Sequence, residues 1–366
     1  MPNIIARSRH LCAVLFLVLS AVIAPLAVAA SLTLYVSPQG SAQASGEKPD
    51  QAFNSLQKAL RAAYDKARDG GVDHVRIEVA PGTYKGQRIV LRQLPVAAHF
   101  EVVAQSGSKS RPVFDGNGKG GTWFILHAPV QNGARFTFSG LEVTNYITAM
   151  SFNGGRKDLD KYLGNNVVEN MVFKNIGQVA KADSKPSTAA VRLVNTRGNT
   201  IRDNRFIGIR NEQNCELLHS IYLAHHSSGN KITGNTFENV CGSPIRMRDN
   251  SNDNIASGNT FRNVQARAVF DEWYCSDKRN AACREKPAPE CPSWGNRYEA
   301  NKVEDSDQRA SKTPTFVHIP EVSARCNAGA APAAGSAAPA AATFRATTDA
   351  KANTGSGAQR ERMIVQ

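Results

Sequence analysis

The middle of the chain carries four copies of one short pattern. Each copy has two asparagines four or five residues apart, with strand-forming residues between them and an apolar residue two positions after the second asparagine. The copies occupy residues 166–173, 199–206, 230–237 and 254–261. Their second asparagines are 34, 31 and 24 residues apart, and a weaker copy lies at 140–143. Short strands repeating every ~20 to 50 residues predict a solenoid, in which each coil covers the apolar face of its neighbour.

Asparagine suits the corners of such coils. It tolerates a left-handed backbone, and its side-chain amide can bond to a neighbouring turn. We therefore expect asparagines at equivalent corners to form hydrogen-bonded ladders along the inside of the solenoid.

The region before the repeats contains short strands and one amphipathic helix. Apolar residues at helical spacing predict a helix over residues 50–66. Runs typical of strands surround it, at residues 32–37, 75–80, 89–91, 100–104, 113–114 and 123–126. No comparable second helix is expected within the repeating region.

Several short segments of this region resemble a known family. They lie at residues 34–40, 52–60, 79–84 and 114–116. Together they look like the entrance of secreted right-handed parallel β-helix proteins of the pectate-lyase-like superfamily, which includes alginate and chondroitin lyases. The resemblance covers about residues 32–305. It implies an all-β, right-handed parallel β-helix with a helical N-terminal cap followed by coils of three short parallel sheets.

The resemblance indicates fold more than activity, because this fold hosts lyases, hydrolases, epimerases and binding proteins. The sequence has no paired-aspartate pattern followed by Gly-His-Gly, which polygalacturonase-like hydrolases would show. It also lacks the Asp-Pro-His-Asp of mannuronan epimerases.

The two ends of the chain differ from its centre. Residues 1–30 combine a basic start, an apolar run and small residues before Ser31, which predicts a cleaved signal peptide. A retained membrane anchor fits less well, because Pro25 interrupts a run already too short for a span. Residues 31–326 form the predicted β-helix domain. The Ala- and Gly-rich residues 327–366 are predicted to be a disordered tail. We thus expect a secreted or periplasmic protein with no membrane contact after cleavage.

Six cysteines remain after removal of the signal peptide: Cys215, Cys241, Cys275, Cys283, Cys291 and Cys326. An even count in an oxidising compartment predicts three disulfides, and none of the spacings resembles a zinc-binding pattern. Cys215 and Cys241 fall on the same side of adjacent coils, so we expect them to pair. The other four would staple a disulfide-bonded C-terminal cap over the last coil, with their pairing left open.

The charge of the chain favours an acidic partner. Lys and Arg number 44 against 31 Asp and Glu, a formal net charge of +13. An exported protein rarely meets nucleic acid, so the expected partner of a monomeric chain is an acidic polysaccharide.

One strand in each coil can be aligned into a strip. The aligned triplets are 191–193, 221–223, 245–247 and 269–271. By strand alternation their middle residues should point outward and form a column, with two further residues along the same face. These predicted strip residues are Arg192, Tyr222, Arg246, Phe270, Arg248 and Glu272. The longer coils add loops at 177–188 and 208–219, which would form a wall beside the strip.

The strip suits β-elimination on a uronate. An arginine would neutralise the carboxylate and acidify the C5 proton, a base would remove that proton, and a tyrosine or histidine would protonate the departing O4. The predicted catalytic residues are Tyr222, Arg246 and one of His226 and His219. His226 is better placed outward, whereas His219 falls on the inward parity. Arg192, Arg248, Phe270 and Glu272 are predicted to bind substrate.

Two other functions use the same residues. Asp249, Asp271 and Glu272 could hydrolyse a glycosidic bond or hold Ca²⁺ against a uronate, although acidic groups among arginines are more often charge partners. Ca²⁺ is the only cofactor that we consider, and no residue is assigned as a metal ligand. A non-catalytic polysaccharide-binding or matrix protein would use the same basic and aromatic strip.

Overall fold

The structure is a computed structural model that describes residues 31–118, 121–128, 133–178, 187–266, 268–275 and 290–304. The predicted signal peptide and C-terminal tail lie outside these residues, as do Cys283 and Cys326. Within the described ranges, no helix has both the length and the apolar character that a membrane crossing requires.

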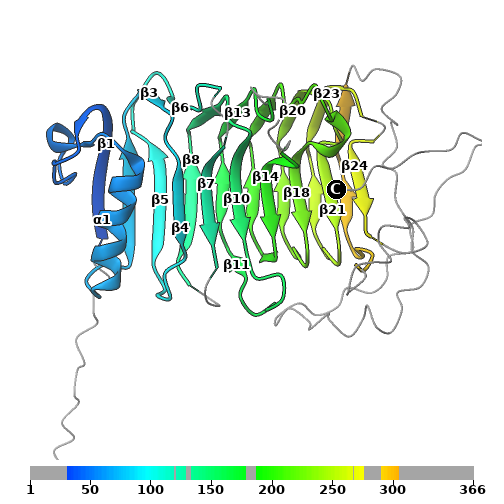
Figure 1. The fold of residues 1–366 in the computed structure, drawn as a ribbon, viewed down its shortest axis with the longest axis horizontal. Coiled ribbons are helices and arrows are strands. Elements are labelled where there is room, and N and C mark those ends of the chain that lie inside the picture. The colour runs from blue at the N-terminus through cyan, green and yellow to red at the C-terminus, as the bar shows by residue number, and fades with distance from the viewer. Residues whose placement is uncertain are drawn as a thin grey trace, which may run out of the picture.

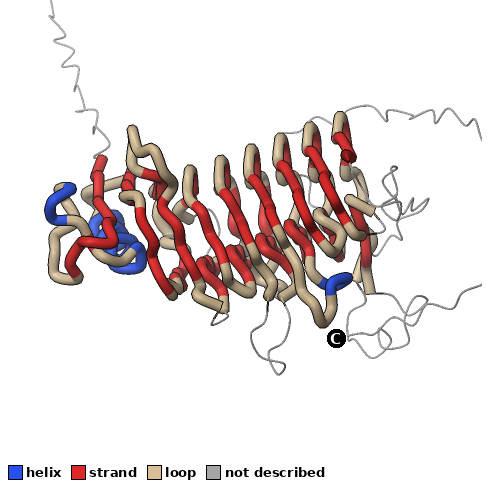
Figure 2. The backbone as a smooth tube through the Cα atoms, turned by 90° about the horizontal axis from the view of Figure 1, so that it is seen from above, coloured by secondary structure: helices blue, strands red, loops and turns tan. Residues whose placement is uncertain are grey.

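Three long sheets run the length of the molecule, and all of their strand pairs are parallel (Figure 1). Successive strands of one sheet come from successive coils, so the chain visits the three sheets in turn (Figure 2). The fold is the predicted right-handed parallel β-helix. We name the sheets A, B and C.

Sheet A contains β1 (Ser31–Ser41), β2 (His74–Val79), β5 (His99–Ala104), β8 (Arg135–Ser139), β12 (Val167–Glu169), β16 (Thr200–Arg202), β19 (Lys231–Thr233), β22 (Ile255–Ser257) and β25 (Arg297–Glu299). Sheet B contains β3 (Gly82–Lys85), β6 (Pro112–Asp115), β9 (Glu142–Thr144), β13 (Val172–Lys174), β17 (Arg205–Ile207), β20 (Thr236–Val240), β23 (Thr260–Val264) and β26 (Lys302–Glu304). Sheet C contains β4 (Ile89–Arg92), β7 (Thr122–His127), β10 (Thr148–Asn153), β14 (Ala189–Val194), β18 (His219–Ala224), β21 (Ile245–Arg248) and β24 (Phe270–Trp273). A small sheet pairs β11 (Leu163–Gly164) with β15 (Thr196–Arg197).

Inward side chains of equal type stack along the core. The apolar residues of the repeat place Phe173, Phe206, Phe237 and Phe261 one above another in sheet B, with ring centroids 4.9, 5.0 and 4.9 Å apart. Parallel pairing in register holds these rings at the spacing of adjacent strands. The repeat pattern therefore determines both the register and the core.

Two asparagine ladders run through the repeats, as predicted. In one, Nδ2 of each asparagine donates to Oδ1 of the next, at 2.8–3.0 Å, through Asn166, Asn199, Asn230, Asn254 and Asn296. The other has the same bonds at 2.9–3.0 Å, through Asn204, Asn235, Asn259 and Asn301. These bonds lie between the sheets and satisfy amides that are buried in the solenoid.

The ladder residues are not themselves the left-handed corner residues. Each follows one, as Asn199 follows Gly198 (φ 64°) and Asn204 follows Asp203 (φ 56°). In the first copy, Asn170 takes the left-handed place (φ 50°) and Met171 the ladder place. The backbone N–H of Met171 still donates to Oδ1 of Asn204, at 2.9 Å.

Helix α1 (Leu56–Arg68) packs across the N-terminal end of the solenoid (Figure 1). Its buried face includes Leu56, Ala59 and Leu60, and the Tyr64 ring packs at a tilt against Phe100, with centroids 4.9 Å apart. The helix starts six residues later than predicted, because Phe53 bridges to β1 and the chain before it forms a 3-10 turn, η1 (Pro49–Gln51). The cap shields strand edges that would otherwise be exposed.

The predicted disulfide between Cys215 and Cys241 is present. It ties η2 (Cys215–Leu217), in the loop before β18, to the turn after β20. Cys275 and Cys291 are also disulfide-bonded. Strands β25 and β26 follow as a further coil on sheets A and B.

Candidate functional site

The outer face of sheet C carries one column of side chains in register. Strand pairing places Arg192 beside Tyr222 and Tyr222 beside Arg246, so the predicted register of these three is confirmed. Asp271 occupies the next position. Ser151 extends the column by one coil in the other direction. This column is the candidate site.

Phe270 does not belong to the column, and its predicted outward position is wrong. It pairs with Ile245, is 2% exposed, and packs in the core against Phe261 and Tyr298. The last strand is displaced by one residue relative to the sequence alignment. A one-residue shift exchanges the two faces of a strand, so Asp271 takes the outward place.

Glu272 is likewise displaced from the predicted strip. It pairs with Met247, whose side chain is buried, and it accepts hydrogen bonds from Asn296 Nδ2 at 3.1 Å and Tyr298 Oη at 2.9 Å. Burial raises the pKa of Glu272 above its ordinary value, although these two bonds oppose the shift. Glu272 thus closes the end of an asparagine ladder.

His219 lies on the outer side of β18, not on the inward side that alternation predicted. Its ring contacts Tyr222, with centroids 5.5 Å apart, and its Nε2 is 3.1 Å from Arg246 Nη1. The neighbouring Ser220 and Ile221 are both fully buried. Alternation is interrupted at this point of the strand.

The imidazole of His219 is neutral. Burial first, and then Arg246, lower its pKa well below the ordinary value. Nδ1 lies 2.8 Å from the Ser243 carbonyl oxygen and therefore donates to it, which leaves the Nε2 lone pair to accept from Arg246. Arg246 Nη2 donates to Asp271 Oδ2, so the guanidinium is held between two fixed partners.

Tyr222 is only 8% exposed, and its hydroxyl oxygen accepts from Arg248 Nη1 at 3.1 Å. Arg248 also donates to both carboxylate oxygens of Glu290, at 2.5 and 2.8 Å, and lies over the ring of Trp273. Burial lowers the pKa of Arg248, but Glu290 and Tyr222 outweigh it and raise the pKa overall. A permanently charged donor therefore faces the phenolic oxygen.

Arg192 differs from the other two arginines of the site. Its Nε and Nη2 donate to Ser151 Oγ at 3.1 and 3.0 Å. Among the described residues, no acidic side chain lies within ion-pair distance of it. Burial, and then the nearby Arg156, lower the pKa of Arg192, yet it stays positively charged at neutral pH. Its charge is available to an anion.

His226 lies at the corner after β18 and outside the column. Its backbone is left-handed (φ 67°), and its Nδ1 is 3.2 Å from Asn250 Nδ2. Burial is the main cause of its lowered pKa. The structure therefore brings His219, but not His226, into contact with Tyr222 and Arg246.

The acidic residues considered for hydrolysis or Ca²⁺ are already engaged. Asp249 accepts from His225 Nδ1 at 2.6 Å and from the backbone N–H of Cys291 at 3.1 Å. Asp271 is paired with Arg246. With Glu272 bound as described above, the three carboxylates do not form one cluster.

Sequence reasoning did not find Ser151, Glu290 or Trp273 as parts of the site. Ser151 could have been found by extending the strand alignment one coil earlier, to residues 150–152. Glu290 lies between two disulfide-bonded cysteines, in a stretch without periodicity, and carried no signal. The position of the Arg248 guanidinium over the Trp273 ring was not predicted either.

Comparisons with known proteins leave the site to be interpreted on its own geometry. No protein-family model matches the sequence, and neither the curated proteins nor the solved structures include a significant match.

Proposed function

We propose that this is a secreted or periplasmic protein, related to the pectate-lyase-like superfamily, that binds an acidic polysaccharide along the outer face of sheet C. We further propose that it cleaves the polymer by β-elimination. One observation carries the proposal: Arg192, partly buried and without an acidic partner among the described residues, lies beside a tyrosine whose hydroxyl faces a second arginine. The disulfides are consistent with an oxidising compartment.

Arg192 would bind the uronate carboxylate. A guanidinium makes paired hydrogen bonds to a carboxylate and stabilises the negative charge that develops when C5 loses its proton. Arg246 and Arg248 are less suited to this role, because Asp271 and Glu290 already neutralise them.

Tyr222 would transfer the proton. As a phenolate, stabilised by the Arg248 N–H, it takes the C5 proton while the C4–O4 bond breaks and a C4=C5 double bond forms. The neutral hydroxyl then returns that proton to O4 of the leaving sugar, so the enzyme ends as it began. His219 has no free lone pair, because Arg246 donates to it, so it positions Arg246 instead of acting as the base.

A binding protein without catalysis is the second candidate. It is favoured by the limited exposure of Tyr222 and by the ion pairs that already occupy Arg246 and Arg248. Such a protein would hold the polymer through Arg192 and leave its length unchanged. A glycoside hydrolase has less support, because the carboxylates are engaged elsewhere.

The test follows ultraviolet absorbance of the unsaturated product with alginate, pectate, hyaluronan, chondroitin and acidic bacterial exopolysaccharides. We expect Tyr222→Phe and Arg192→Ala each to lower the rate by about 100-fold or more. Tyr35→Phe in β1 and Arg202→Ala on sheet A of the same coil as Arg192 are matched controls that should keep full activity.

Polymer size and polymer binding are measured in parallel. Cleavage without rising absorbance would indicate a hydrolase. Binding without cleavage, lost in Arg192→Ala, would support the second candidate. Full activity of both Tyr222→Phe and Arg192→Ala would refute the assignment of the site to sheet C.

A further inference from the structure

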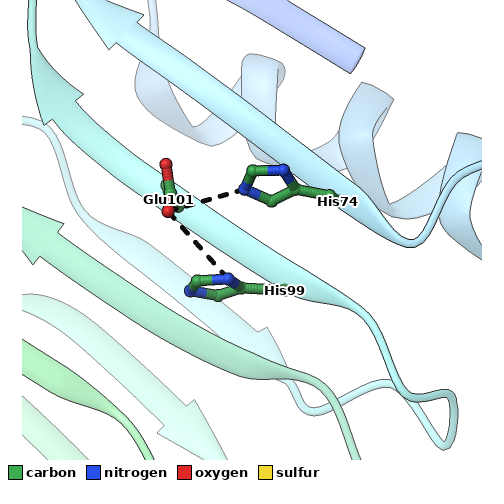
Figure 3. A group of neighbouring side chains, drawn as sticks. All are labelled: His74, His99 and Glu101. Atoms are coloured by element: carbon green, nitrogen blue, oxygen red, sulfur yellow. Dashed lines mark ion pairs between the residues drawn. The ribbon is translucent and has the colours of Figure 1, made fainter. Parts of the chain in front are cut away.

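Two histidines and a carboxylate converge on the outer face of sheet A, near the N-terminal cap (Figure 3). His74 begins β2 and His99 begins β5, and the two are paired in register. Their rings stack with centroids 5.3 Å apart. Glu101 follows two residues along β5 and so lies on the same face.

The ligand atoms of these side chains point toward one another (Figure 3). Oε1 of Glu101 is 3.5 Å from His74 Nε2 and 4.0 Å from His99 Nδ1. All three ligand atoms lie within 4.8 Å of one another. His74 Nε2 is buried and has no hydrogen-bond partner. The side chains are 42%, 22% and 22% exposed, so an ion could enter from solvent.

The outer atoms of the cluster are held by other residues. His99 Nε2 is 2.9 Å from Thr137 Oγ1, and Arg76 Nη1 donates to Glu101 Oε2 at 3.0 Å. When His99 Nε2–H donates to Thr137, its Nδ1 lone pair faces the carboxylate oxygen. Two acceptors that face each other repel, and a cation bound between them would remove this repulsion. Metal-bound histidines usually donate their other ring N–H to an outer partner in this way, which fixes the orientation of the ring.

Burial first, and then Arg135, lower the pKa of His99, and this outweighs the opposite effect of Glu101.

We propose that His74, His99 and Glu101 form a binding site for a divalent first-row transition ion, of which Zn²⁺ fits best. Two imidazoles and one carboxylate are a known Zn²⁺ ligand set, whereas Ca²⁺ prefers oxygen ligands alone. Zn–N and Zn–O bonds of about 2.0–2.2 Å need ligand atoms ~3.3 Å apart. Small side-chain rotations would achieve this spacing. A bound ion would cross-link β2 and β5 beside the cap, on a different sheet from the proposed polysaccharide site.

A second cluster, formed by His225, Asp249 and Glu290, is less suited to an ion. His225 Nδ1 donates directly to Asp249, and the guanidinium of Arg248 occupies both oxygens of Glu290. A cation there would have to displace these bonds next to a permanent positive charge. This cluster therefore supplies the matched control.

The experiment is titration calorimetry of the untagged, chelator-treated full-length chain with ZnCl₂ at neutral pH. We expect one Zn²⁺ per chain. His74→Gln should weaken binding by more than 100-fold, and Thr137→Val, which removes only the outer hydrogen bond, by about 10-fold. His225→Gln should bind as the unaltered protein does. Binding should also weaken in acid, because protons compete with the metal for its ligands.

Thermal unfolding provides a readout that does not depend on activity. Zn²⁺ should raise the unfolding midpoint of the unaltered protein and of His225→Gln, but not that of His74→Gln. The midpoints without Zn²⁺ check that each variant is folded. Absence of Zn²⁺ binding to the unaltered chain, or loss of binding in His225→Gln but not in His74→Gln, would overturn the proposal.

Discussion

The imidazole of His219 is held in one protonation state by two partners. It donates to the Ser243 carbonyl oxygen and accepts from Arg246, and there is no space for a second proton without breaking the latter bond. Protonation would also place a positive charge next to a guanidinium in a buried position. Protonation of His219 in acid would therefore break its hydrogen bond with Arg246 and disturb the site.

This arrangement predicts a loss of stability in acid. The pKa of His219 is depressed in the folded protein, so the unfolded chain binds the proton more tightly. The stabilisation is complete above about pH 6.5 and decreases as the pH falls below that value. His99, His127 and His226 contribute in the same direction, since burial lowers the pKa of each.

The measurement is the free energy of unfolding in urea at about pH 7.5 and about pH 5.5. His219→Gln keeps a donor and an acceptor but does not titrate, so its stability should fall less between the two pH values. An equal fall in both proteins would show that His219 does not contribute.

The orientation of His219 illustrates where sequence reasoning is insufficient at the residue scale. Strict alternation placed it inward, but its ring contacts Tyr222 and Arg246 on the outer side, and the next two residues, Ser220 and Ile221, are both fully buried. The orientation of the first side chains in a strand depends on the conformation of the preceding loop. Here the loop is tied by the disulfide between Cys215 and Cys241, and periodicity carries no information about it.

The asparagine ladders join the elements of successive coils. Asn235 makes side-chain bonds to both neighbours: Oδ1 accepts from the backbone N–H and Nδ2 of Asn204, and Nδ2 donates to Asn259 and to the Ile201 carbonyl oxygen. All of these groups are buried, so each lost bond leaves an unsatisfied partner.

Replacing Asn235 with Ala should therefore destabilise the protein by about 4 kcal/mol, given ~1 kcal/mol for each of these four buried bonds. Lys231→Ala, exposed on the same coil, should change stability by no more than about 0.5 kcal/mol. Urea unfolding of the two variants compares them. A cost for Asn235→Ala as small as that of the control would show that the ladder does not stabilise the solenoid.

At this scale the sequence predicts most of the fold, because the same residues that repeat also form the ladders and the core stacks. It fails where one coil departs from the repeat. Residues 274–296 separate β24 of sheet C from β25 of sheet A. Alignment to the asparagine pattern therefore could not fix the register of Phe270 and Asp271.

The whole molecule carries a large positive charge, +13 from the full sequence. Much of the charge on sheets A and B is paired across coils, as in Arg202 with Glu169 and Arg262 with Glu304. Attraction of an acidic polymer would combine the overall field with the local charge of Arg192. Both contributions act partly through solvent and are screened by salt.

Binding of an acidic polymer should therefore weaken by at least about 10-fold when NaCl is raised from ~0.05 to ~0.5 M. Calorimetry or affinity electrophoresis can measure this, with a neutral polymer of similar length as the control. Affinity that does not respond to salt would contradict a charge-based mode of binding.

The coils differ in length, but the asparagine hydrogen bonds that join them do not. Asn204 and Asn235 are 31 residues apart and Asn235 and Asn259 are 24 apart, yet the amide bonds measure 2.9 and 3.0 Å. The additional residues lie in the loop before β18, beside the column of Arg192 and Tyr222. That loop could be shortened, extended or replaced by a loop from another protein while the sheets and the asparagine ladders stay intact. Ligand preference and scaffold stability can therefore evolve, or be engineered, independently.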